Sequence, residues 1–267
     1  MTFTPGDSFL VLDDGWYRPT DHTRGPWDPE ACHAGPPAGA IARELELRSP
    51  DLPLRRLTVD LLRPIPFAGF RIRTEVVHGG RTVSTTSAEL IDGDDRVCAR
   101  ARGLHIAGRD PIELPTLPQR HPGGAPADAH DGPFPIEQAL HDQPAFNDPS
   151  GVRMRYPDGH DNSPGPTTTW MRTVPLLPNE PTSPFQRICA LADSGNAISR
   201  NAQPWEVNFV NPDLTVVLHR NPVGDWLGSQ AESHWQPDGV GLADALLFDE
   251  LGPVGRAVQT LVLRVPS

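Results

Sequence analysis

Apolar and polar residues alternate along three stretches between residues 71 and 106, as half-buried β-strands require. The stretches are RIRTEVVHG (71–79), RTVSTTSAELID (81–92) and RVCARARGLHI (96–106), and they are rich in β-branched side chains. Glycine and aspartate at 78–80 and 92–95 separate them and favour tight turns. We therefore predict a run of antiparallel strands joined by short turns.

Each half of the chain also contains a segment that favours a helix ahead of its strands. In the first half this is PPAGAIARELELR (36–48), where two prolines suit the first helical turn because its N–H groups need no partner inside the helix. In the second half it is SPFQRICALADSGNAISR (183–200), with Ser183 as the cap and Pro184 as the first helical residue. A helix followed by antiparallel strands predicts an α+β unit in which a curled sheet wraps one helix.

The chain matches itself when it is shifted by 157 residues. LTVDLLR (57–63) then lies on LTVVLHR (214–220), and AIAR (40–43) lies on AISR (197–200). Aligned without a gap, residues 57–106 share twelve identities in fifty positions with the second copy, where roughly three are expected by chance. The sequence therefore predicts two copies of one structural unit.

Composition changes between the two copies. Residues 108–150 are rich in proline, glycine, histidine and aspartate, and such a segment cannot bury enough apolar surface to fold by itself. We predict an N-terminal unit at 1–107, a linker at 108–150 that lies across the surface of the sheets, and a C-terminal unit at 151–267.

Charge and composition limit the partners. The formal net charge is -11, all 23 basic residues are arginine, and no basic run occurs, which argues against nucleic acid and against an anionic membrane surface as partners. No stretch approaches the roughly 18–20 apolar residues of a membrane span, and the first residues do not resemble a signal peptide.

Cysteine and histidine usage indicates no metal site and no disulfide framework. The three cysteines are odd in number and form no CxxC pair, which favours reduced thiols and a cytoplasmic location. The histidines match no zinc-binding spacing.

The second half resembles a known family. LADSGNAISR (191–200), VNPDLTVVLHR (210–220), VGDWLGSQAES (223–233) and GPVGRAVQTLVLR (252–264) are similar to the second unit of type II acyl-CoA thioesterases. The resemblance implies an α+β double hot dog, in which two tandem hot-dog units form one extended antiparallel sheet with helices packed on it. It also implies hydrolysis of acyl-CoA in fatty acid metabolism, with CoA as part of the substrate and no separate cofactor. A homo-oligomer of such double units is one assembly open to the chain.

The resemblance places the attacking water between Asp193, Asn211 and Gln259. Asp193 would take the proton of the water or orient it, and the two amides would hold the water in place. Asn211 departs from the family pattern, because the best-known members have Thr at this position. Asn still offers hydrogen-bonding groups to a water, on a longer side chain.

The repeat offers its own argument for a single site. At the same shift, Asp193 lies on Pro36, Asn211 on Leu54 and Gln259 on Arg102, so that the polar groups occur in one copy alone. This pattern predicts one active site per chain.

The developing oxyanion needs backbone N–H donors. Asp193 lies inside the predicted helix 183–200, away from that helix's own N-terminus, so we select His33 to Gly35, at the start of the opposite helix, as the substrate-binding segment. Trp170, Trp205, Trp226 and Trp235 are candidates for the wall of an acyl channel.

Several alternatives stay open at this stage. A protein that binds acyl thioesters without hydrolysing them would have the same fold. Each site residue also has a simpler structural interpretation: Asp193 as a solvated helix residue, Gln259 as an outward strand residue, and Asn211 as a turn residue before Pro212.

Two other enzyme classes fit less well. GDSF (6–9) is similar to the nucleophile block of a lipase-like serine hydrolase family, but no Asp-x-x-His element follows His219. A hot-dog hydratase would need Asp-x4-His on its central helix, and Ile198 occupies the fifth position after Asp193.

Overall fold

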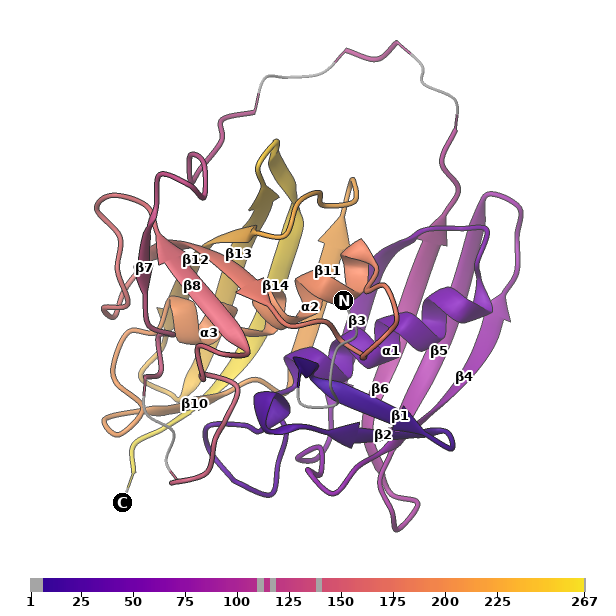
Figure 1. Ribbon diagram of the computed structural model, residues 1–267, viewed down its shortest axis with the longest axis horizontal. Coiled ribbons are helices and arrows are strands. Elements are labelled where there is room, and N and C mark those ends of the chain that lie inside the picture. Colours follow the sequence, from indigo (N-terminus) through magenta and orange to yellow (C-terminus); the bar gives the residue numbers. More distant parts are fainter. Residues whose placement is uncertain (1–6, 110–112, 116–118, 138–140, 267) are drawn as a thin grey trace.

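A computed structural model of the chain describes residues 7–109, 113–115, 119–137 and 141–266 (Figure 1). The strands are β1 (Leu10–Asp13), β2 (Trp16–Pro19), β3 (Leu54–Leu61), β4 (Arg71–His78), β5 (Val83–Ile91), β6 (Val97–Ile106), β7 (His130–Gly132), β8 (Val152–Tyr156), β9 (Thr167–Thr173), β10 (Asn208–Val210), β11 (Asp213–Leu218), β12 (Leu227–Trp235), β13 (Val240–Asp249) and β14 (Gly252–Arg264). The helices are η2 (Asp21–Thr23, a 3-10 turn), α1 (Gly35–Arg48), α2 (Pro184–Asp193) and α3 (Gly195–Ile198).

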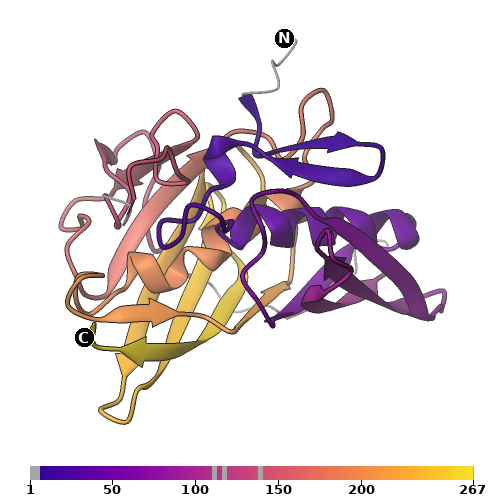
Figure 2. The same cartoon turned by 90° about the horizontal axis from the view of Figure 1, so that it is seen from below.

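Twelve strands form a single antiparallel sheet. Its order is β4-β5-β6-β3-β11-β14-β13-β12-β9-β8-β7, with β10 also paired to β14. The helices α1 and α2 lie on the same face of this sheet, and the hairpin β1–β2 lies over α1 (Figure 2). The predicted α+β plan is confirmed, and the three predicted strands are β4, β5 and β6.

The two halves meet at strands β3 and β11, where equivalent residues face each other. Thr58 pairs with Thr215, its own counterpart at a separation of 157 residues, and their hydroxyl oxygens are 3.3 Å apart. A residue that pairs with its own repeat lies on a local twofold axis. The duplication inferred from the sequence is therefore also the symmetry that joins the two halves into one sheet.

The shift of 157 residues describes the strands but not the helices. β4, β5 and β6 fall on β12, β13 and β14, whereas α1 (35–48) would fall on 192–205, a range that includes no more than the last two residues of α2 (184–193). The correspondence of Asp193 with Pro36 is therefore wrong as a structural equivalence, because Asp193 ends a helix and Pro36 begins one. The other two correspondences hold, since Leu54 begins β3 as Asn211 precedes β11, and Arg102 and Gln259 lie inside matching strands.

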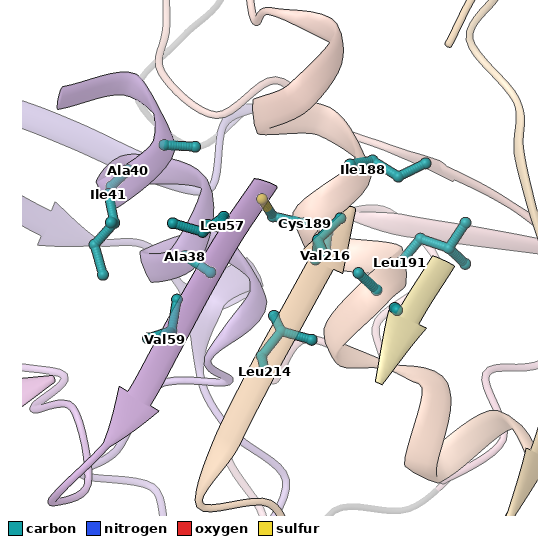
Figure 3. Close-up of a cluster of buried hydrophobic side chains, with 14 of the residues drawn as sticks. Ala38, Ala40, Ile41, Leu57, Val59, Ile188, Cys189, Leu191, Leu214 and Val216 are labelled. Atoms are coloured by element: carbon teal, nitrogen blue, oxygen red, sulfur yellow. The ribbon is translucent and has the colours of Figure 1, made fainter. Parts of the chain in front are cut away.

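A continuous apolar core crosses the junction between the halves. Side chains from α1 and β3 meet side chains from α2 and β11 in one cluster (Figure 3). Leu57, Val216 and Cys189 in this cluster are completely buried. Because apolar area removed from water stabilises a fold by about 25 cal/mol per Å², this shared core ties the two halves together.

Polar contacts hold α1 and α2 in a fixed position. The Arg43 guanidinium donates to both carboxylate oxygens of Glu180, at 2.7 and 2.9 Å. Glu46 accepts from the Ser183 hydroxyl at 2.8 Å and from the Gln186 amide at 2.7 Å. Ser183 also caps α2 by accepting from the Gln186 backbone N–H, which confirms the predicted start of this helix.

The segment 108–150 contributes to the core where it is described. Phe134, Ile136 and Phe146 are each 4% exposed or less, and they belong to the main apolar cluster. Strand β7 lies within the same segment, at the far edge of the sheet from β4. These aromatic and branched side chains therefore pack below the surface. The proline-rich composition around them had predicted a surface linker instead.

Candidate active site

Asp193, Asn211 and Gln259 lie together, as predicted. The Asn211 side-chain amide donates to Asp193 Oδ1 at 3.0 Å, and the Gln259 amide approaches the same oxygen at 3.4 Å. Asp193 is 4% exposed and Gln259 is 1% exposed. Asp193 is therefore not a solvated helix carboxylate, and Gln259 points into the protein.

Gln259 explains why the helix ends at Asp193. Its Nε2 donates to the Asp193 backbone carbonyl at 3.0 Å, and its Oε1 accepts the Asn196 backbone N–H at 3.0 Å. A side chain from β14 thus replaces hydrogen bonds that a continuous helix would make. The expected single helix 183–200 is wrong in this respect: α2 stops at Asp193 and α3 begins at Gly195.

Asn211 combines two functions that the sequence had offered as alternatives. Its Nδ2 donates to Asp193 Oδ1 and also to the Asp213 carbonyl, at 3.1 Å, which is the local bond of a turn residue. Its Oδ1 accepts from the Asn196 side chain at 3.3 Å. One asparagine therefore shapes the turn before β11 and holds the carboxylate.

Asn196 is a site residue that the sequence analysis missed. It is 8% exposed, and it connects Asn211 through its side chain to Gln259 through its backbone N–H. A signal was present, because residues three apart on a helical segment lie on the same face and Asn196 is three positions after Asp193.

The segment His33 to Gly35 lies against Asp193, across the boundary between the halves. His33 Nδ1 is 3.0 Å from Asp193 Oδ2, and it accepts a hydrogen bond from the Gly35 backbone N–H at 3.1 Å. The imidazole stacks on the Phe146 ring, with their centroids 3.8 Å apart. The prediction considered only the backbone of this segment, so the contact of the imidazole with the carboxylate is a new finding.

A cavity of about 570 Å³ opens beside these residues. Its size is typical of small-molecule sites. His33, Asp193, Asn196 and Asn211 supply polar groups to its wall. The apolar part of the wall includes Trp27, Leu61, Ile65, Phe134, Ile136 and Val210.

The tryptophan in the cavity is not one of the four that were selected. Trp170 is completely buried beside Phe248, and Trp205 is 63% exposed. Trp226 faces the Arg155 guanidinium, and Trp235 packs on Phe209. Trp27 lines the cavity instead, because the loop ahead of α1 folds back over the end of β3.

A larger hollow, of about 810 Å³, lies elsewhere, over strands β3 to β6. Its wall is dominated by charged and hydroxyl side chains such as Arg73, Glu75 and Arg102. It offers little apolar surface to an acyl chain, so the smaller cavity is the better candidate.

Burial sets the electrostatics of the titratable groups around the cavity. It lowers the pKa of the His33 imidazole below the usual 6.5, and the Asp193 carboxylate acts in the opposite direction. Burial also raises the pKa of the neighbouring Cys32 thiol, with Arg24 opposing it. Cys32 therefore stays a thiol at neutral pH, which makes it a poor nucleophile.

The alternative enzyme classes find little support in these contacts. The Ser8 hydroxyl is completely buried and donates to the Leu10 carbonyl, so it is not an accessible nucleophile; Gly6 of the same motif lies outside the described residues. An imidazole does lie next to Asp193, but it comes from the other half of the chain.

Comparison with known proteins agrees with the fold. The model of the acyl-CoA thioesterase N-terminal domain matches residues 23–106, and that of the C-terminal domain matches residues 118–263. This chain therefore belongs to the acyl-CoA thioesterase family. No curated protein matches it significantly by sequence.

Solved structures share the whole architecture at low sequence identity. A candidate thioesterase from Novosphingobium aromaticivorans has a TM-score of 0.75 and 17% identity, with 96% of this chain and 98% of that chain covered. A hot-dog protein of unknown function from Alicyclobacillus acidocaldarius has a TM-score of 0.71 and 17% identity, with 98% of both chains covered. The acyl-CoA thioesterase II TesB2 of Mycobacterium marinum has a TM-score of 0.63 and 17% identity, with 97% and 96% covered. The double hot-dog fold is thus confirmed.

Two features are absent from the described residues. No helix in them is long and apolar enough to cross a membrane. No group of three or more His, Cys, Asp or Glu side chains among them is arranged to hold a metal ion.

Proposed function

We propose that this protein hydrolyses acyl-CoA to a free acid and CoA, at a single site centred on Asp193. The main support is a buried carboxylate at the wall of a largely apolar cavity, held by hydrogen-bond donors from the C-terminal half and contacted by the His33 imidazole from the N-terminal half. In this proposal Asp193 takes a proton from the attacking water while the water oxygen bonds to the thioester carbonyl carbon. Membership of the acyl-CoA thioesterase family supports the same chemistry.

Water attacks the thioester carbonyl, and the carbonyl oxygen becomes negatively charged. The Gly35 N–H is the proposed donor to this oxygen, in exchange for the hydrogen bond that it makes to His33 Nδ1 at 3.1 Å. It is the single N–H in the first three residues of α1, because Pro36 and Pro37 have none. The carbon–sulfur bond then breaks, the sulfur leaves with the electron pair, and the proton that Asp193 took from the water moves to the sulfur.

Asn211 and Gln259 have the proposed role of fixing the position of Asp193. Both amides donate to Asp193, and both of their oxygens accept from Asn196. The remaining lone pair of Asn211 Oδ1 is the group best placed to hold a water, since Asn211 lines the cavity. Gln259 would act mainly by fixing the break between α2 and α3.

The cavity also suggests how a CoA thioester would lie. Its apolar wall suits an acyl chain or the pantetheine arm, and Arg63 and Arg264 belong to the same wall. Arginine suits phosphate because its guanidinium offers two parallel donors. We propose that these two arginines face the phosphates of CoA.

The proposal is tested by thiol release from acyl-CoA substrates of increasing chain length. Asp193→Asn keeps the size of the side chain and removes its charge, and we expect kcat to fall by at least 100-fold, within the range of general-base catalysis. Asp244→Asn is the control, since Asp244 pairs with Arg256 on β14 and does not line the cavity.

Two results would contradict the proposal. A loss of less than tenfold in Asp193→Asn would remove Asp193 from its assigned role. Binding of every acyl-CoA by the wild-type protein without turnover would favour the alternative, a non-catalytic acyl-thioester-binding protein.

A further inference from the structure

Two side chains from the segment between the repeated units form part of the cavity wall. Phe134 and Ile136 line the cavity beside Asp193, and each of them is 4% exposed. Both follow β7 and precede β8, within the predicted linker 108–150. The proposed hydrolysis assigns no role to this pair of side chains, which we call the linker wall.

The linker wall lies close to the carboxylate. The Phe134 ring meets the Phe146 ring edge to face, with the two centroids 5.5 Å apart. Phe146 stacks on the His33 imidazole at 3.8 Å, and His33 Nδ1 is 3.0 Å from Asp193 Oδ2. Three successive contacts therefore connect Phe134 to the carboxylate, which puts the linker wall within reach of a medium-length chain bound there.

Hydrogen bonds fix the backbone on both sides of the linker wall. The Tyr156 hydroxyl, on β8, donates to the Pro133 carbonyl at 2.7 Å. The Asn147 side-chain amide donates to the Ile136 carbonyl at 3.0 Å. A closely packed protein interior yields little to added volume. The linker wall is therefore a fixed boundary of the cavity.

Exposure distinguishes two parts of the cavity wall. Arg63 and Arg264 are exposed, whereas Phe134 and Ile136 are buried. The phosphates of CoA carry charges that are costly to bury without partners, so the CoA head belongs at the exposed arginines. An apolar chain gains free energy when it leaves water. The acyl chain therefore belongs against the linker wall.

We propose that Phe134 and Ile136 set the longest acyl chain that the cavity accepts, and that the substrates are acyl-CoA molecules with short or medium-length chains. This inference rests on the proposed hydrolysis at Asp193 and adds the substrate class to it. A longer chain would have to displace side chains whose backbone is fixed, and forcing extra carbons into a packed contact is unfavourable. The segment that joins the two units would thus determine specificity.

CoA thioethers measure this limit without turnover, because their carbon–sulfur bond is not hydrolysed. The ligands are S-alkyl-CoA molecules from butyl to hexadecyl, and isothermal titration calorimetry with the full-length protein gives each dissociation constant. A methylene that moves from water into an apolar cavity tightens binding about fourfold. In the wild type we expect this gain for each methylene up to the linker wall, and no further gain from dodecyl onwards.

Shortening the linker wall should extend the limit. In Ile136→Ala we expect binding to tighten about fourfold for each of at least two further methylenes. Phe134→Leu should act in the same direction and keeps most of the apolar volume, so it is the second variant if Ile136→Ala fails to fold. Ile91→Ala and Phe70→Leu are the matched controls, because both residues are completely buried and neither lines the cavity. Both controls should keep the wild-type limit.

Thiol release from the corresponding acyl-CoA substrates relates binding to turnover, and we expect kcat/KM of the two linker-wall variants to peak at longer chains than in the wild type. An unchanged limit in the folded variants, as judged by circular dichroism, would overturn the inference. Binding that keeps tightening beyond dodecyl in the wild type, or no binding of any thioether, would do the same. A wild-type protein that shows the limit with thioethers but releases no thiol would contradict the proposed hydrolysis instead.

Discussion

At the scale of single residues, the site depends on hydrogen bonds that leave few polar groups unpaired. Asn211 shows this most clearly, because it contacts Asp193, Asn196 and Asp213 with one short side chain. Its bond to the carboxylate is charge-assisted and partly buried, and such bonds contribute more than bonds between neutral exposed groups.

Asn211→Ala should therefore lower kcat more than it raises KM. Removing a hydrogen bond to a charged group costs about 1.5–3 kcal/mol, which corresponds to roughly 10- to 100-fold in rate. Steady-state kinetics with a CoA thioester measures kcat and KM of this variant. Asn221→Ala is the control, because Asn221 accepts from Arg55 in an exposed pair. An unchanged kcat would show that Asp193 needs no support from Asn211.

At the scale of elements, the site exists because two helices approach each other closely. A side chain on Gly35 would place its Cβ 2.9 Å from the Ala190 Cα and 3.2 Å from His33 Nδ1. Glycine at the start of α1 thus permits the contact with α2 that brings His33 to Asp193. Gln259, on β14, fixes Asp193 and Asn196 at the break between α2 and α3.

Gly35→Ala should separate α1 from α2 and damage both stability and activity. Forcing an extra carbon into a well-packed contact costs about 1–3 kcal/mol. Urea unfolding gives the free-energy change, and thiol release gives the activity. Gly108→Ala is the control, since nothing lies within 4 Å of a Cβ at that position. Equal stability of the two variants would contradict the close contact at Gly35.

At the scale of the whole molecule, the two units share one sheet and one core. If the halves were separated, β3 and β11 would become unprotected edges, and the apolar side chains between α1 and α2 would face water. Exposed edge strands favour aggregation. The covalent link between the two units thus keeps together two halves that would otherwise have to associate as separate chains.

We expect that residues 1–107 and 108–267, produced separately, do not unfold cooperatively, and that the two pieces produced together form one complex. The break lies after β6, outside the sheet. Circular dichroism melting and size-exclusion chromatography test this. A cooperative, monomeric melting transition of residues 1–107 alone would show that the shared core is dispensable.

The sequence by itself determined the elements and the duplication. Period-two alternation defined β4, β5 and β6, because half-buried strands need it. The constant shift of 157 residues predicted the relation of β3 to β11, since matching strands of a duplicated unit keep matching apolar faces. Asp193, Asn211 and Gln259 were also found from the sequence, through the family resemblance.

The tertiary structure alone decided how these residues act on one another. Gln259 ends α2 from a strand 66 positions away, and His33 reaches Asp193 from the opposite half. The burial of Phe134 and Phe146, within a proline-rich segment, was equally hidden. These contacts depend on the crossing of α1 and α2 and on the sheet beneath them. Local periodicity records which face of a strand is buried, but it carries no information about which distant side chain meets it there.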